Sequence, residues 1–167
     1  TGDSGVTGAQ QFILEDVARQ VERYGKDTAF FCTNCSMQEP LIREVYETGA
    51  IYTLQCCTSP FHAIPAALNI DMADHAADVD YLIEQVKAKT AEMGMSGRVS
   101  TWKVPLSMLN IAGGVEYAIK ILDGETNGIV DDAVLSQTLQ DCAKEIWGSG
   151  ITIAKYTENG VKVPHHY

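Results

Sequence analysis

The chain has 167 residues, and its 12 lysines and arginines stand against 22 aspartates and glutamates, a formal net charge of −10. This length suits one compact domain, and a hydrophobic content of 46% excludes a wholly disordered protein. The negative charge repels phosphate groups, and no cluster of lysine and arginine offsets it locally. We therefore expect no nucleic-acid partner and no docking on an anionic membrane surface.

The first predicted elements alternate between helix and strand. Apolar residues at helical spacing predict a helix over residues 9–24, and a continuous apolar run predicts a buried strand over residues 28–32. A second helix, which ends at Gly49, leads into a second buried strand over residues 50–54. This alternation with short joints is typical of βαβ crossovers and of a parallel sheet covered by helices.

The middle of the chain continues the pattern after an irregular stretch. We expect a short helix over residues 66–70 and a long helix over residues 75–93 with Asp74 as its cap. A third strand is predicted over residues 99–104, where Pro105 ends it.

The last third of the chain predicts two helices and a hairpin. On the helix that ends near residue 122, one apolar face is marked by Leu109, Val115, Ile119 and Leu122. A further helix fits residues 132–147, and a strand over residues 151–156 returns over residues 161–163 through the Asn159-Gly160 turn. The economical fold is a single α/β domain over residues 1–167. It is a three-layer α/β/α sandwich with a mainly parallel, Rossmann-like sheet and a C-terminal hairpin.

Five cysteines are present, an odd count that does not fit a complete set of internal disulfides: Cys32, Cys35, Cys56, Cys57 and Cys142. Cys142 lies on the inward stripe of its helix and is expected in the core. Cys32 and Cys35 have C-x-x-C spacing after the first strand, and two adjacent cysteines and His62 follow the second. Four thiols and an imidazole suit zinc or an iron–sulfur cluster, so a metal or redox protein is one alternative. Adjacent cysteines rarely chelate one metal well, so the sequence assigns no metal ligand and no cofactor.

Ligands of open α/β sheets bind beyond the carboxyl ends of the strands. Those ends carry hydrogen-bonding groups and a few aromatic rings, which suit a small polar ligand such as a sugar or nucleoside. The candidate ligand-binding residues are Thr33, Asn34, Gln55, Ser59, Phe61, His62 and Trp102. No G-x-S-x-G, H-E-x-x-H or glycine-rich phosphate motif is present, so no catalytic residue is assigned and we expect no enzyme.

Several runs of the sequence resemble known proteins. Residues 8–31, which open with GAQQ and close with GKDTAFF, resemble the start of the second lobe of type I periplasmic binding proteins. The run VEYAIKILDGE at residues 115–125 is similar to a late helix of their sugar-binding members. Residues 49–62, GAIYTLQCCTSPFH, resemble a family of uncharacterised bacterial lipoproteins described only as a domain of unknown function.

The resemblance implies a fold and a setting. It implies one ligand-binding lobe, excised from a two-lobe solute-binding or sensor lipoprotein outside the cytoplasm, with a missing N-terminal lobe as the other cleft wall. A membrane transporter is then a possible partner. It also implies a setting in which paired thiols tend to oxidise. Either the host is anaerobic and the thiols persist, or Cys32 and Cys35 form a disulfide. An intracellular effector-sensing domain of a regulator is the third alternative, since regulators share this fold.

Overall fold

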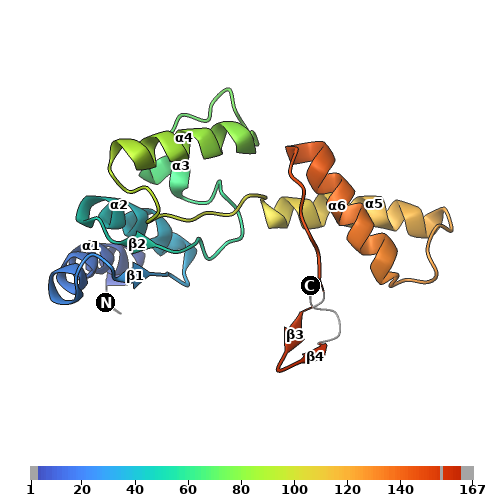
Figure 1. The fold of residues 1–167 in the computed structure, drawn as a ribbon, viewed down its shortest axis with the longest axis horizontal. Coiled ribbons are helices and arrows are strands. Elements are labelled where there is room, and N and C mark those ends of the chain that lie inside the picture. The colour runs from blue at the N-terminus through green and yellow to red at the C-terminus, as the bar shows by residue number, and fades with distance from the viewer. Residues whose placement is uncertain (1–3, 155, 163–167) are drawn as a thin grey trace. The chain divides into compact units, whose positions relative to one another are not determined.

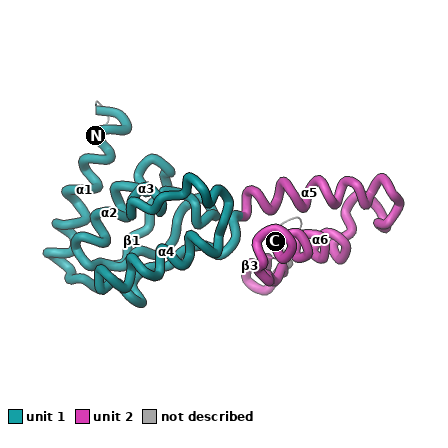
Figure 2. Tube along the Cα trace, turned by 90° about the horizontal axis from the view of Figure 1, so that it is seen from above, with its two compact units in different colours: residues 1–105 teal, residues 106–167 magenta. Residues whose placement is uncertain are grey.

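The computed structural model describes residues 4–154 and 156–162 of the chain (Figure 1). The chain divides into two compact units, residues 1–105 and residues 106–167 (Figure 2). The single domain expected over residues 1–167 stays a prediction. Among the described residues, no helix has the length and apolar content needed to cross a membrane.

The first unit is built mainly from helices. Its elements in chain order are α1 (Gly5–Tyr24), β1 (Ala29–Phe30), η2 (Cys35–Met37), α2 (Gln38–Thr48), β2 (Ile51–Tyr52), α3 (Ile64–Ala67) and α4 (Val79–Glu92). Helix α2 lies at the centre and packs on α1 and α3. Its buried side chains include Leu41, Ile42 and Val45, which join Leu82 of α4 in one apolar core. Gly49 ends α2 in the left-handed region, at φ 74°, as its position in the sequence predicted.

The sheet of the first unit is smaller than the sequence suggests. Strands β1 and β2 pair in parallel, with Ala29 opposite Ile51 and Phe30 opposite Tyr52. The predicted third strand over residues 99–104 is wrong beyond its start, because Val99 forms only a single parallel bridge to Tyr52. The chain is thus a mixed α/β protein with a parallel sheet of two strands.

Helix α4 begins later than the predicted start at residue 75. Its cap is Asp78 and not Asp74, because the Asp78 carboxylate accepts a hydrogen bond of 2.9 Å from the backbone N–H of Tyr81. Ala77, directly before the cap, has φ 65° and cannot continue a helix from the residues before it. The described chain therefore turns between His75 and Asp78 before the helix starts.

The second unit is a helix pair followed by a hairpin. Helices α5 (Leu106–Leu122) and α6 (Asp132–Trp147) pack on each other, and β3 (Thr157–Glu158) pairs with β4 (Val161–Lys162) in antiparallel fashion. The Asn159-Gly160 turn is confirmed, with φ 51° and 79° at the two residues. The predicted strand over residues 151–156 is not one: β3 starts at Thr157, and residues 155 and 163 lie outside the described residues.

The buried face of α5 differs from the predicted one. Leu109 is buried as expected, together with Gly113 and Tyr117, whereas Val115 and Leu122 are exposed. The contact with α6 selects this face, because a Cβ at Gly113 would overlap the end of the Leu139 side chain. A small residue at position 113 lets the two helices approach closely, whereas a Cβ at the neighbouring Gly114 would meet nothing within 4 Å.

Asp131 starts α6. Its carboxylate accepts hydrogen bonds from the backbone N–H groups of Asn127, at 3.0 Å, and Val134, at 3.2 Å. These bonds favour the charged form and lower the pKa of Asp131. Gly148, at φ 64°, ends the helix, so its predicted bounds of 132–147 are confirmed. Cys142 is buried on α6, as expected.

Candidate functional site

The carboxyl ends of β1 and β2 meet at one edge of the small sheet. Because the strands are parallel, the chain leaves both at this edge, into residues 31–34 after β1 and residues 53–63 after β2. Thr53 ties the two exits together, since its hydroxyl donates to the carbonyl of Phe30 at 2.8 Å. We call this region the carboxyl edge. All but one of the ligand residues predicted from the sequence lie on the two segments that leave it, and Trp102 contacts the second of them.

Two buried hydrogen bonds in series hold the segment that follows β1. The Tyr52 hydroxyl donates to Gln38 Oε1 at 2.6 Å, and Gln38 Nε2 donates to the carbonyl of Cys32 at 2.9 Å. Gln38 is fully buried and Tyr52 is 1% exposed. An amide at the start of α2 therefore holds the turn that leads to Cys35, a role of Gln38 that no motif in the sequence indicates.

Two of the predicted ligand residues bind their own chain. The side-chain amide of Gln55 donates to the Thr101 hydroxyl at 2.9 Å, and the Trp102 indole donates to the Gln55 carbonyl at 3.1 Å. These contacts hold residues 99–102 beside the exit from β2. Gln55 is 1% exposed, so its side chain positions this edge in the structure, and ligand contact by Gln55 or Trp102 stays a prediction.

The remaining predicted residues divide between surface and core. Thr33 and Asn34 are exposed, and Asn34 Oδ1 accepts a hydrogen bond of 2.9 Å from the backbone N–H of Ser36 at the start of η2. Ser59 accepts a hydrogen bond from the backbone N–H of Phe61, and the Phe61 ring packs against the core. The structure thus places Thr33 and Asn34 on the surface of the carboxyl edge, where a ligand can reach them.

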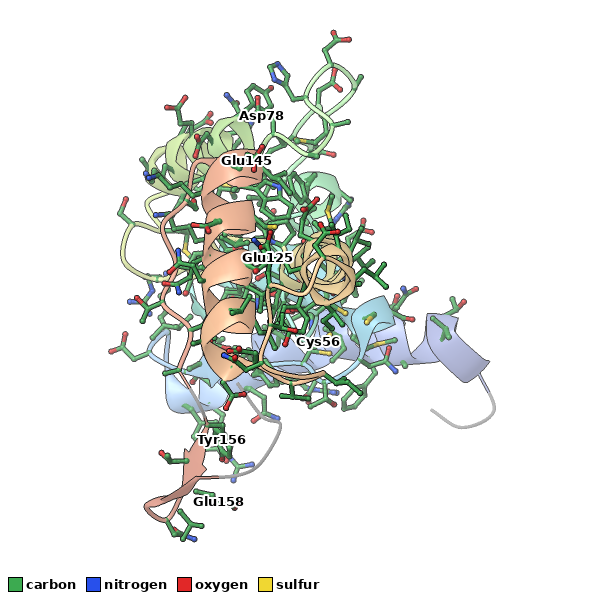
Figure 3. All side chains as sticks on the ribbon, turned by 90° about the vertical axis from the view of Figure 1, so that its right-hand side faces the viewer. Cys56, Asp78, Glu125, Glu145, Tyr156 and Glu158 are labelled. Atoms are coloured by element: carbon green, nitrogen blue, oxygen red, sulfur yellow. The ribbon has the colours of Figure 1, made fainter. Side chains whose placement is uncertain are left out.

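Three thiols and one imidazole meet at the carboxyl edge, on the two exits that the sheet brings together. Cys35 contributes from η2, and Cys56 (labelled in Figure 3), Cys57 and His62 contribute from the segment after β2. One sulfur or ring-nitrogen atom of each lies within 4.8 Å of those of the others. The sulfur of Cys35 lies 2.9 Å from that of Cys57 and 3.7 Å from that of Cys56, and the adjacent Cys56 and Cys57 sulfurs are 4.0 Å apart.

Cys32 takes no part in this group, although the C-x-x-C spacing pairs it with Cys35. Its thiol donates to the carbonyl of Asn34 at 3.3 Å, and all five cysteines are free thiols. The short sulfur contacts of Cys35 go to the other exit of the sheet. The structure therefore groups Cys35 with Cys56, Cys57 and His62.

Contacts among these sulfurs shift the pKa values of their thiols in opposite directions. The hydrogen bonds that Cys35 shares with Cys57 and Cys56 hold the pKa of Cys35 below its usual range. The bond to Cys35 raises the pKa of Cys57 to about 12, and burial raises the pKa of Cys32. The pKa of Cys35 is thus lowered, whereas those of Cys32 and Cys57 are raised.

His62 is held by a tight turn. Its backbone N–H donates to the Ser59 carbonyl at 3.3 Å, and its own carbonyl accepts from Ile64 at 2.8 Å. The next residue, Ala63, has φ 62°, a left-handed conformation that residues with a Cβ rarely adopt. The Nε2 atom of His62 is buried and has no hydrogen-bond partner within the described ranges. Burying an imidazole nitrogen without a partner costs free energy, unless the nitrogen forms a hydrogen bond or binds a metal ion.

A surface hollow of about 470 Å³ lies at the opposite end of the sheet. Its lining includes Lys26 and Gly49, which precede the two strands, together with Arg98. Arg98 donates to the carbonyl of Lys26 and forms an ion pair with Asp27 at 2.9 Å. This hollow includes none of the residues predicted to bind ligand.

Comparison with solved structures finds a similar fold. The chain resembles a protein from Clostridium difficile 630 whose crystal structure is described as that of a "Putative transcriptional regulator", at a TM-score of 0.73 and 22% sequence identity. The similarity covers 93% of this chain and 43% of that protein, so the chain spans less than half of its length. No curated protein matches the chain.

A family profile matches residues 1–100, which include the carboxyl edge and all four residues of the thiol–imidazole group. The profile is described as "Protein of unknown function (DUF3798)". The match covers more than half of the chain. The chain belongs to the DUF3798 family.

Proposed function

We propose that this chain is one ligand-binding lobe of a two-lobe solute-binding or sensor protein, and that it binds its ligand without chemical change. The observation that supports it most is the carboxyl edge, where the segments after two parallel strands meet and the segment after β1 carries the exposed Thr33 and Asn34. Ligands of α/β proteins bind at such edges. The solved structure of similar fold is more than twice as long, which leaves room for a second lobe.

The finer parts of the proposal concern the whole protein. Its two lobes have the type I periplasmic-binding-protein fold, with a three-layer, Rossmann-like arrangement when complete. It is an extracytoplasmic lipoprotein that binds a small polar ligand such as a sugar or nucleoside and delivers it to a membrane transporter. Thr33 and Asn34 are the ligand contacts that this lobe supplies from its exposed surface.

An intracellular sensing domain is the second candidate. The observation that favours it is the similar fold of the Clostridium difficile protein, which is described as a "Putative transcriptional regulator". In this alternative the same edge binds an effector, and the second lobe is joined to a DNA-binding segment. The gene sequence upstream of residue 1 separates the two: a lipoprotein signal supports the first candidate and a helix-turn-helix supports the second.

Ligand binding is tested on the full-length protein. Thermal-shift screening against sugars and nucleosides is expected to yield at least one compound that raises the unfolding temperature. The variant Asn34→Asp, which keeps the oxygen that caps η2 but loses the amide donor, is expected to reduce that shift. Asn69→Asp, an exposed change elsewhere in the same unit, serves as the matched control. A screen without any shift, or equal effects of the two variants, contradicts the proposal.

A further inference from the structure

We infer that Cys35, Cys56, Cys57 and His62 form a binding site for one zinc ion, or for another thiolate-preferring divalent ion of the same size. The sequence assigned no metal ligand to the chain, because adjacent cysteines rarely chelate one ion well. The inference depends on these four side chains alone. It stands independently of the proposed lobe function, and either can fail without the other.

The distances among the sulfurs suit one ion bound by all three. A tetrahedral zinc ion with Zn–S bonds of about 2.3 Å places its sulfur ligands about 3.8 Å apart. The Cys35–Cys56 distance of 3.7 Å and the Cys56–Cys57 distance of 4.0 Å already match that edge. Only the Cys35–Cys57 pair, at 2.9 Å, has to open, by about 0.9 Å on the same geometry. Cys35 is exposed at the start of η2, where rotation about its Cα–Cβ bond supplies that movement.

His62 completes the set. One of its ring nitrogens lies within 4.8 Å of every one of the three sulfurs, and zinc bonds to imidazole at about 2.0–2.1 Å. Three cysteines and one histidine are a common ligand set of structural zinc sites. The imidazole is held by the turn before the strained Ala63, and its Nε2 has no protein partner in the described part of the chain.

The backbone around the site is already fixed before any ion binds. The exit from β1 is held by Gln38, and the exit from β2 is held by the contacts of Gln55 with Thr101 and Trp102. Such outer contacts orient ligands and keep the entropic cost of binding low. A metal ion would in turn link the two exits across 21 residues of sequence, from Cys35 to Cys56.

The spacing favours one ion over an iron–sulfur cluster. A 4Fe–4S cluster binds each cysteine on a different iron, and in a 2Fe–2S cluster only two cysteines share an iron, so at least one pair among three thiolates has to lie farther apart than these sulfurs do. Soft sulfur ligands also select against magnesium and calcium, which prefer oxygen.

The experiment is a metal titration of the fully reduced 167-residue chain in the absence of oxygen. Zinc is added in competition with a chromophoric chelator, and cobalt is used in parallel as a spectroscopic substitute. We expect one ion per chain, with the intense near-ultraviolet absorption of thiolate-bound cobalt and the visible bands of a tetrahedral ion. Failure of the wild-type chain to bind zinc or cobalt overturns the inference.

Variants identify the ligands. Cys56→Ser and His62→Gln are each expected to lower zinc affinity by more than the roughly 100-fold that loss of an outer contact costs. Cys32→Ser is the matched control, since it changes a thiol on the same turn that lies outside the group, and it should leave affinity and the cobalt spectrum unchanged. Circular dichroism of the metal-free variants establishes that each is folded. An effect of Cys32→Ser as large as that of Cys56→Ser, or no effect of His62→Gln, contradicts the four-residue site.

Discussion

The hydrogen-bond chain from Tyr52 through Gln38 to the turn before Cys35 makes a quantitative prediction. Tyr52→Phe removes the hydroxyl that donates to Gln38 Oε1 at 2.6 Å and leaves that oxygen buried without its donor. Leaving a buried polar group without its partner costs about 1–3 kcal/mol of stability, and the substitution retains the aromatic ring. We therefore expect the free energy of unfolding of the first unit to fall by about 1–3 kcal/mol.

Tyr46→Phe is the matched control. The Tyr46 hydroxyl is bonded to the Thr90 hydroxyl at 2.8 Å, and both residues are mostly buried. When this bond is lost, the Thr90 hydroxyl can turn to a carbonyl of its own helix, one turn earlier. The expected loss is therefore smaller, about 0.5–1 kcal/mol.

Urea unfolding followed by tryptophan fluorescence measures both losses. Trp102 lies in the first unit and Trp147 in the second, so the comparison is made in a Trp147→Phe background. The background change lies in the second unit, and its own cost is common to both variants, so it cancels in the comparison. A loss for Tyr52→Phe equal to or below that for Tyr46→Phe would refute the role assigned to Gln38.

Three further predictions concern single residues. Gly114→Ala, where an added Cβ meets nothing within 4 Å, should stabilise the second unit by about 0.5–1 kcal/mol in thermal unfolding, whereas Gly113→Ala should yield no gain because its Cβ overlaps Leu139. Ala63→Gly should raise stability by about 1 kcal/mol in urea unfolding, because glycine adopts φ 62° without a Cβ clash; a destabilised variant would show that no strain is stored there. Asp131 has a lowered pKa in the folded chain, so its stabilisation is present above its unfolded pKa, near 4, and is lost as the pH falls through the lower folded value. Thermal unfolding midpoints of Asp131→Asn should therefore decline less than those of the wild type over that acidic range, and parallel curves would contradict the prediction.

Local signals in the sequence were sufficient where a short segment decides its own structure. Helix α6 was predicted with its observed bounds from the helical spacing of its apolar residues, and the structure shows Asp131 and Gly148 at its two ends. The Asn159-Gly160 turn was likewise predicted from a local signal, since both residues tolerate positive φ.

The sheet was predicted less well because its extent depends on distant residues. Residues 99–104 were predicted as a strand, yet only Val99 pairs, and residues 101 and 102 bond to Gln55 instead. The Gln55 side chain, 46 residues away in the sequence, bonds Thr101 where the strand was expected. The spacing of apolar residues along a segment does not predict such a distant contact.

The candidate site was half visible in the sequence. Parallel strands predict that the segments after β1 and β2 meet, and this placed Cys35 near Cys56 and Cys57. The sequence could not predict that Cys35 and not Cys32 joins the group, because this depends on the direction in which the turn after β1 points each thiol. The spacing of the adjacent cysteines depends likewise on the bend of the chain after β2, which no propensity describes.

The most direct test of the thiol–imidazole group as a metal site is the coordination shell of zinc bound to the reduced chain, measured by X-ray absorption at the zinc edge. The four-residue site at the carboxyl edge predicts three sulfur ligands at about 2.3 Å and one nitrogen at about 2.0–2.1 Å. A shell of four sulfurs, which would require a cysteine outside the group, or a shell of oxygen and nitrogen alone would contradict it.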